Sequence, residues 1–263
     1  MPPRKRLRSY DSAKIRSAVL GQYAQVREAV AGLSEEQLDA PTHLDGWAVR
    51  DLAAHVSIAV RAVSAAIDLP EPPKAELALL DAPFVTASLA EAVAEGSRAL
   101  AAAERDLASF GAKVAAKLAE DLAATPDDRR LTTRLGTIEL LPFLVTRTVE
   151  LTVHTDDLNR ATGLDIPVDR EALAACTRML ADALAVKAPG GSTEVRVPPF
   201  AVVQCVEGPR HTRGTPPNVV ETDPLTWVRL ATGRTTWAEA HSAAKISASG
   251  ERSDLSALLP LMS

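Results

Sequence analysis

The sequence has few aromatic residues, only two cysteines and no long apolar run. Aromatic residues make up 3% of the 263 positions, whereas hydrophobic residues make up 46%. Alanine and leucine therefore supply most of the apolar surface, which favours closely packed helices over a β-sandwich. Cys176 and Cys205 are too few to form a disulfide framework. No stretch reaches the ~20 apolar residues that a membrane-spanning helix needs.

The charge and the N-terminal residues exclude further classes of protein. The net charge of −5 argues against nucleic acid as the main partner. The first ten residues, MPPRKRLRSY, are basic but no apolar segment follows them, so we interpret them as a solvated tail and not as a secretory signal. We expect a soluble cytoplasmic protein, monomeric or a small homo-oligomer, that binds neither nucleic acid nor a membrane.

Apolar residues recur at helical spacing over the first two thirds of the sequence. This spacing predicts four long helices, over residues 11–33, 49–68, 87–124 and 138–163, with the third broken near Gly111. Pro142 is tolerated in the first turn of the fourth helix, and Gly163 ends it. Turn-rich segments join these helices, so we predict an antiparallel four-helix bundle. A fifth helix over 169–187 completes a helical domain at 10–188.

The composition changes at residues 188–192, where the sequence becomes APGGS. β-branched and alternating segments follow at 194–208, 218–223 and 245–250, with helix-like segments at 224–233 and 253–261. These features predict a small α+β domain at 190–263. The predicted fold is therefore a mainly α N-terminal four-helix bundle with a small α+β C-terminal domain.

Three polar residues on two predicted helices have the chemistry of a metal site. Glu150 and His154 are four residues apart, so they share one helix face, and His55 lies on the helix predicted at 49–68. Two ligands from one helix and a third from a neighbour match the open, three-ligand pattern of catalytic zinc. The alternative is a solvent-facing stripe in which Arg147 pairs with Glu150, His154 is exposed, and His55 is an ordinary core or surface histidine.

Two phrases carry a resemblance to a known family. They are L-x-G-W-x-V-R-D-L-x-x-H, from Leu44 to His55, and R-T-V-E-L-x-V-H-x-D-D-L, from Arg147 to Leu158. They resemble the mycothiol-dependent maleylpyruvate isomerase-like family of actinobacteria, which belongs to a class of metal-binding four-helix bundles. The resemblance implies a divalent metal, usually zinc, held by His55, Glu150 and His154. Residues 223–261 resemble the sterol-carrier-like second domain of the same family.

The resemblance also implies a chemistry, in which the thiol of mycothiol binds the metal and adds to a cis double bond of the substrate. Coordination by a cation deprotonates a thiol, so a metal held by the three candidate ligands suits a thiol cofactor. Arginine binds carboxylates, so the arginines of the sequence suit an anionic substrate. The family's second domain contributes an arginine to the active site, for which Arg229, preferred by its position, and Arg234 are candidates. Arg147 and Trp47 are candidates for cofactor binding, although Trp47 also suits a packing role.

We therefore expect a divalent-metal-dependent enzyme that uses a low-molecular-weight, mycothiol-like thiol for transfer to, or isomerisation of, a small anionic substrate. Asp157, one turn after His154, is expected to orient that imidazole. The first alternative is a sterol-carrier-like protein that binds a lipid or small molecule without catalysis, although the ~70 residues after Glu194 are few for a complete carrier domain. The second is a scaffold that retains ligand residues without turnover.

Overall fold

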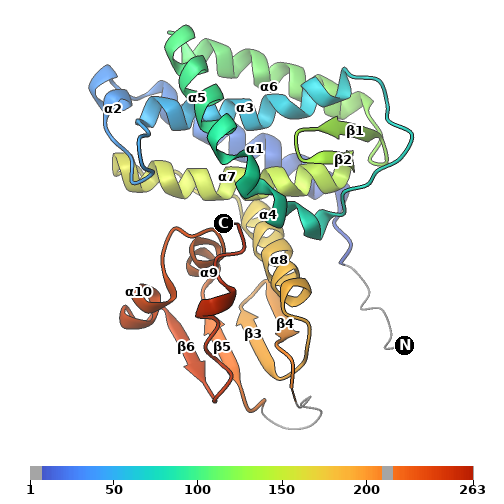
Figure 1. Ribbon diagram of the computed structural model, residues 1–263. Coiled ribbons are helices and arrows are strands. Elements are labelled where there is room, and N and C mark those ends of the chain that lie inside the picture. The colour runs from blue at the N-terminus through green and yellow to red at the C-terminus, as the bar shows by residue number, and fades with distance from the viewer. Residues whose placement is uncertain (1–7, 209–215, 263) are drawn as a thin grey trace.

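The computed structural model describes residues 8–208 and 216–262, and it places a layer of long helices above a smaller α/β part (Figure 1). The long helices are α1 (Ser12–Ala31), α3 (Val49–Ile67), α5 (Ala90–Ala103), α6 (Leu107–Ala124) and α7 (Leu140–Thr162). Short helical elements join them: α2 (Glu35–Asp39), η1 (Leu79–Asp81), α4 (Ala82–Val85) and η2 (Thr86–Leu89). The basic segment 1–7 lies outside the described residues.

The helical bundle that the sequence predicts is present, with α3 in its middle. α1, α3, α6 and α7 pack against one another, and α5 packs on α3. On α1 the buried residues Ile15, Val19, Tyr23 and Val26 recur every three or four positions and so form one apolar face. Asp11 caps the start of this helix by accepting a hydrogen bond from the Lys14 amide.

The helix predicted at 87–124 is broken at residues 104–106, and the prediction of a break near Gly111 is wrong. Glu104 has an extended conformation, and the Asp106 side chain accepts a hydrogen bond from the Ser109 amide and so caps α6. Gly111 lies inside α6, where a Cβ atom would come within 3.3 Å of the Tyr23 hydroxyl. This glycine therefore serves the close approach of α6 to α1.

A β-hairpin precedes α7, the helix predicted at 138–163, and was not predicted from the sequence. Strands β1 (Arg130–Thr133) and β2 (Gly136–Glu139) pair antiparallel, with Leu131 opposite Ile138. Ile138 therefore belongs to a strand, and α7 begins two residues later, at Leu140. The far end of α7 agrees with the prediction, because Gly163 has a φ of +72° there and ends the helix.

The C-terminal part contains a four-stranded sheet with the strand order β4-β3-β5-β6. The strands are β3 (Thr193–Val197), β4 (Ala201–Cys205), β5 (Val219–Thr222) and β6 (Ile246–Ser249); only the central pair, β3 and β5, is parallel. The helix predicted at 224–233 is α9 (Pro224–Ala231), and α10 (Trp237–Ser242) follows. The segment predicted to be helical at 253–261 forms a single 3₁₀ turn, η3 (Ser256–Leu258), which ends shortly before Pro260.

Helix α8 (Arg170–Lys187) joins the two parts (Figure 1). It packs on α7 and α1 on the helical side and on β4 and α9 on the other side, so one buried apolar cluster runs through both parts. Arg8, expected in a solvated tail, forms a 2.7 Å ion pair with Asp182 of α8. Among the described residues, none of the helices has the length and apolar character that crossing a membrane requires.

The packing of α6 into the bundle gives a first prediction. Leu118 is fully buried, so Leu118→Ala should lower the free energy of unfolding by ~2–5 kcal/mol through lost burial and an internal cavity. Val186→Ala, at a half-exposed valine of α8, is the control and should change it by less than ~0.5 kcal/mol. Urea unfolding followed by circular dichroism measures both, and equal effects would contradict this packing.

Candidate metal centre and adjoining cavity

The polar stripe of α7 faces the interior of the protein. Arg147 and His154 are buried, Asp157 is fully enclosed, and Glu150 is partly buried between them. A solvent-facing stripe, the alternative that the sequence allowed, is therefore excluded. Because buried charges are costly without partners, each of these side chains must be compensated by groups on other segments.

Glu150 lies between the two histidines. One of its carboxylate oxygens, Oε2, is 3.2 Å from His55 Nε2 on α3 and 3.4 Å from His154 Nε2 one turn along α7. The ring centroids of the histidines are 4.5 Å apart and their planes are almost perpendicular. One potential ligand atom from each of the three residues lies within 4.8 Å of the others. The structure thus brings together the three residues that the sequence analysis selected as ligands.

The outer nitrogens of both histidines are held by other side chains. His154 Nδ1 is 2.9 Å from Asp157 Oδ2, as expected from their spacing. His55 Nδ1 is 3.3 Å from Ser97 Oγ of α5, whose own proton is donated to the Val93 carbonyl at 2.7 Å. Ser97 therefore accepts the proton of His55 Nδ1. With Nδ1 of both rings held in this way, both Nε2 atoms face the carboxylate of Glu150, where a cation would meet one Nε2 atom from each ring.

Asp157 connects the centre to two other segments. Its Oδ1 atom is 2.8 Å from His43 Nε2, in the loop before α3, and its Oδ2 atom is 3.0 Å from Arg234 Nη2. Next to it on α7, Asp156 accepts two hydrogen bonds from Arg229 of α9, at 2.6 and 2.8 Å. Of the two candidate arginines, Arg234 shares a carboxylate with His154, whereas Arg229 contacts the neighbouring aspartate.

The environment gives the histidines and carboxylates different pKa values. Burial lowers the pKa of His55, and the neighbouring His154 lowers it further, so its imidazole favours the neutral form. Burial alone would raise the pKa of Glu150, but the hydrogen bonds from both histidines hold it well below its usual range. For His154, burial is outweighed by the hydrogen bond to Asp157, which raises its pKa. The centre therefore keeps an ionised carboxylate beside a neutral imidazole.

Trp47 and Arg147 flank the centre on different sides. The Trp47 ring packs edge-on against His55, with 5.6 Å between centroids. The Arg147 guanidinium lies 4.6 Å from the centre of the Phe143 ring, and its nearest approach to Glu150 is 3.9 Å. Trp47 therefore restrains a candidate ligand, whereas Arg147 adds a positive charge next to the candidate carboxylate.

A cavity of about 510 Å³ adjoins the centre. His55, Arg147 and Glu150 are among its polar lining residues, and α3, α5 and the β1–β2 hairpin form most of its walls. The other lining residues are Ile58, Ala59, Arg61, Ala62, Ala65, Ala66, Leu69, Thr86, Leu89, Val93, Gly96, Leu100, Thr132, Thr133, Arg134, Leu135 and Phe143. Most of them are apolar, so this cavity could hold a small organic molecule next to the three candidate ligands.

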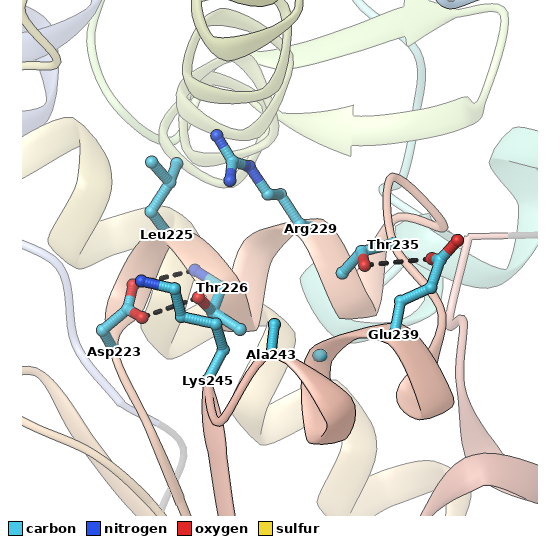
Figure 2. A pocket seen from close by; sticks show the side chains of 9 residues that line it. Asp223, Leu225, Thr226, Arg229, Thr235, Glu239, Ala243 and Lys245 are labelled. Carbon is cyan, nitrogen blue, oxygen red and sulfur yellow. Dashed lines mark hydrogen bonds between the residues drawn. The ribbon is translucent and has the colours of Figure 1, made fainter.

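A second cavity, of about 430 Å³, lies in the C-terminal part between α9, α10 and the segment that precedes β6 (Figure 2). Its charged groups already have structural roles, since Asp223 caps α9 through Thr226 and Glu239 bonds the Thr236 amide that precedes α10. Arg229 also borders this cavity, but Figure 2 shows its guanidinium extending away from Asp223 and Lys245. The hydrogen bonds to Asp156 explain this direction.

Sequence reasoning selected the three central residues and Asp157 but missed the groups that hold them in place. Ser97 was missed because a serine within an alanine-rich helix carries no signal of its own. Asp156 was missed because its partner lies 73 positions away along the chain. His43 was not selected because it lies in a loop, outside the helices that carry the three candidate ligands. It does not join the cluster of three, and it contacts Asp157 instead.

Comparison with known proteins places this architecture among characterised folds. Residues 20–159 match the family model of the mycothiol maleylpyruvate isomerase N-terminal domain, and residues 169–261 match that of the bacterial SCP ortholog. The crystal structure of a mycothiol-dependent maleylpyruvate isomerase is similar, with 17% identity, a TM-score of 0.60 and coverage of 93% of this chain and 95% of that chain. A histidine-to-alanine mutant of such an isomerase gives 16% identity with the same score and coverage. No curated protein matches significantly.

The ion pair between Arg229 and Asp156 gives a second prediction, because it joins α9 to α7. Asp156 is buried while Arg229 is partly exposed, so Arg229→Met should lower the free energy of unfolding by ~2–3 kcal/mol, less than the ~3–5 kcal/mol for a fully buried pair. The control is Arg50→Met, which removes pairs with the exposed Glu35 and Asp39 and should cost at most ~1 kcal/mol. Urea unfolding of the full chain distinguishes the two. A loss for Arg229→Met no larger than that of the control would refute the structural role.

Proposed function

Because this chain belongs to the mycothiol maleylpyruvate isomerase N-terminal domain family, we propose that it is a metal-dependent enzyme using a low-molecular-weight thiol. The family match covers more than half of the sequence. The observation that carries the proposal is the meeting of His55, Glu150 and His154 beside a cavity. The reaction is thiol transfer to, or isomerisation of, a small anionic substrate, with mycothiol as the thiol.

The donor set supports a divalent cation and favours zinc. Two imidazole nitrogens and one carboxylate oxygen are a ligand set used by catalytic zinc, which keeps a further position open. Asp157 and Ser97 orient the two imidazoles, as the outer partners of metal-binding histidines do. A bound cation of this kind would lower the pKa of a coordinated cofactor thiol, so that the thiol is ionised at neutral pH.

The chain's own thiols do not suit the reaction. Cys176 and Cys205 are both buried, and burial raises the pKa of the Cys176 thiol, so it stays protonated. An external thiol is therefore needed, and the lack of a disulfide between these two cysteines agrees with the cytoplasmic location that we propose. Arg147 lines the cavity and provides positive charge beside the three central residues, where an anionic substrate would be oriented, whereas Arg234 is bound to Asp157.

The alternative of a sterol-carrier-like protein without catalysis receives less support from the geometry. The cavity in the C-terminal part is bordered by Asp223, Glu239 and Lys245, which are poor neighbours for an apolar ligand. The more apolar cavity lies in the helical part, next to the three central residues. We therefore advance no second function.

The third prediction tests the metal centre. Purified wild-type protein should contain stoichiometric divalent metal, and His55→Ala, Glu150→Ala and His154→Ala should each lose most of it, because two remaining ligands hold a cation weakly. Asp157→Asn should weaken metal affinity by about 10–100-fold, because it loosens the orientation of His154. Elemental analysis and competition with a chelator measure these effects. His241→Ala, at an exposed histidine of α10, is the control, and stoichiometric metal in all three alanine variants would refute the site.

The fourth prediction tests the thiol. Calorimetric titration of zinc-loaded protein with mycothiol should show binding, whereas S-methyl mycothiol should bind at least ~10-fold more weakly, because it cannot provide a thiolate. In Glu150→Ala, the difference between the two compounds should disappear. Equal affinities in the wild-type protein would mean that the sulfur does not reach the centre.

A further inference from the structure

Arg147 is a buried cation whose hydrogen bonds go to neutral oxygens. Its Nε and Nη2 atoms donate to Thr146 Oγ1, at 3.2 and 3.1 Å, and its Nη1 atom donates to the Ala59 carbonyl at 3.3 Å. A guanidinium has five N–H groups. The three hydrogen bonds to Thr146 and Ala59 use three of these N–H groups and leave the other two to donate elsewhere. The nearest carboxylate, that of Glu150, is 3.9 Å away and already serves both histidines.

The surroundings of Arg147 contrast with those of Arg229. Arg229 is partly exposed and forms two short hydrogen bonds with one aspartate. Arg147 is more deeply buried and lines the cavity, and the ring of Phe143 restrains its guanidinium. Because a buried charge is costly unless it is closely paired, and Glu150 approaches Arg147 only to 3.9 Å, this guanidinium suits a further anion that enters the cavity. A carboxylate matches its planar pair of N–H groups.

The remainder of the cavity is mainly apolar. Most of its other lining residues are aliphatic, and most of these belong to α3, α5 and η2, among them Ile58, Ala62, Val93 and Leu89. Two further arginines, Arg61 and Arg134, are exposed and so stand at the rim. The volume of about 510 Å³ lies in the range of ~300–1,000 Å³ that encloses drug-sized ligands. A small dicarboxylate would leave most of these walls without contact.

We propose that the substrate of this site is an amphipathic carboxylic acid, whose carboxylate binds Arg147 and whose apolar body lies along the walls formed by α3 and α5. This inference rests on the proposed function, because it names the substrate class of the same site. It places the atoms next to the carboxylate beside His55 and Glu150. It also makes Arg147, on the helix that carries two of the three candidate metal ligands, the residue that selects an acid over a neutral analogue.

The test is a binding series with saturated acids and zinc-loaded protein. Calorimetry with butanoate, hexanoate and octanoate should show affinity rising by about fourfold per added methylene group, as expected for burial of apolar surface. Octanamide should bind at least ~10-fold more weakly than octanoate, because it lacks the charge. Maleate, a short dicarboxylate, should bind more weakly than octanoate. Tighter binding of maleate, or affinity that does not depend on chain length, would overturn the proposal.

Substitutions at two positions, Arg147 and Gly96, examine the two ends of the cavity separately. Arg147→Met should remove the preference for octanoate over octanamide, and Arg147→Lys should restore part of it, with circular dichroism confirming that both variants fold. Gly96 lines the cavity, and a Cβ atom added there would have no neighbour within 4 Å, so a leucine side chain can extend into the cavity. Gly96→Leu should therefore weaken the binding of octanoate at least ~10-fold more than the binding of butanoate. Gly21→Leu is the matched control on α1, where a Cβ atom also meets nothing. If Gly96→Leu and Gly21→Leu weakened octanoate binding equally, the aliphatic part of the bound acid would not lie where we propose.

The same measurements separate this inference from the metal proposal. In protein stripped of metal with a chelator, octanoate should bind more weakly, because the negative charge of Glu150 is then not neutralised by a cation and repels the carboxylate of octanoate. The binding of octanoate should nevertheless still depend on Arg147. If zinc does not bind but this dependence persists, the metal proposal fails and the carboxylate site stands. If zinc and mycothiol bind while octanoate does not, the carboxylate site fails and the metal proposal stands.

Discussion

The compensation of buried charge along α7 is the constraint on which the rest of the site depends. Three acidic side chains of this helix point into the protein, and each is paired with a group from another segment. Glu150 is paired with His55 of α3, Asp156 with Arg229 of α9, and Asp157 with His43 and Arg234. Because an unpaired buried carboxylate is costly, these contacts fix how α3, the loop before it and the C-terminal part lie against α7.

This arrangement links the candidate centre to the C-terminal part of the protein. Asp157 contacts both His154 and Arg234, so one carboxylate orients a candidate ligand and binds the segment after α9. A displacement of that segment would therefore change the environment of the imidazole. The regions of the two family matches are therefore joined at one helix. The first match, 20–159, ends within α7, and Asp156 and Asp157 of α7 bind arginines that lie in the second match, 169–261.

The long helices could be predicted because their signals are local. The apolar spacing of α1 and α3, and the glycine that ends α7, depend on residues within a few turns. The errors lie where distant contacts decide. Gly111 suggested a break, yet it is helical because its missing side chain admits α1. Ile138 suggested a helix start, but its pairing with Leu131 places it in a hairpin.

The sequence by itself determined the types of chemical group at the candidate centre and the face of α7 that carries them, because residue identity and helical periodicity are local properties. Only the tertiary structure decided that this face is buried and that His55 reaches it across 95 positions of the chain. It also decided that Ser97 restrains the ring, and that an apolar cavity ends at Arg147. These features arise from the packing of separate helices, which no short stretch of sequence encodes.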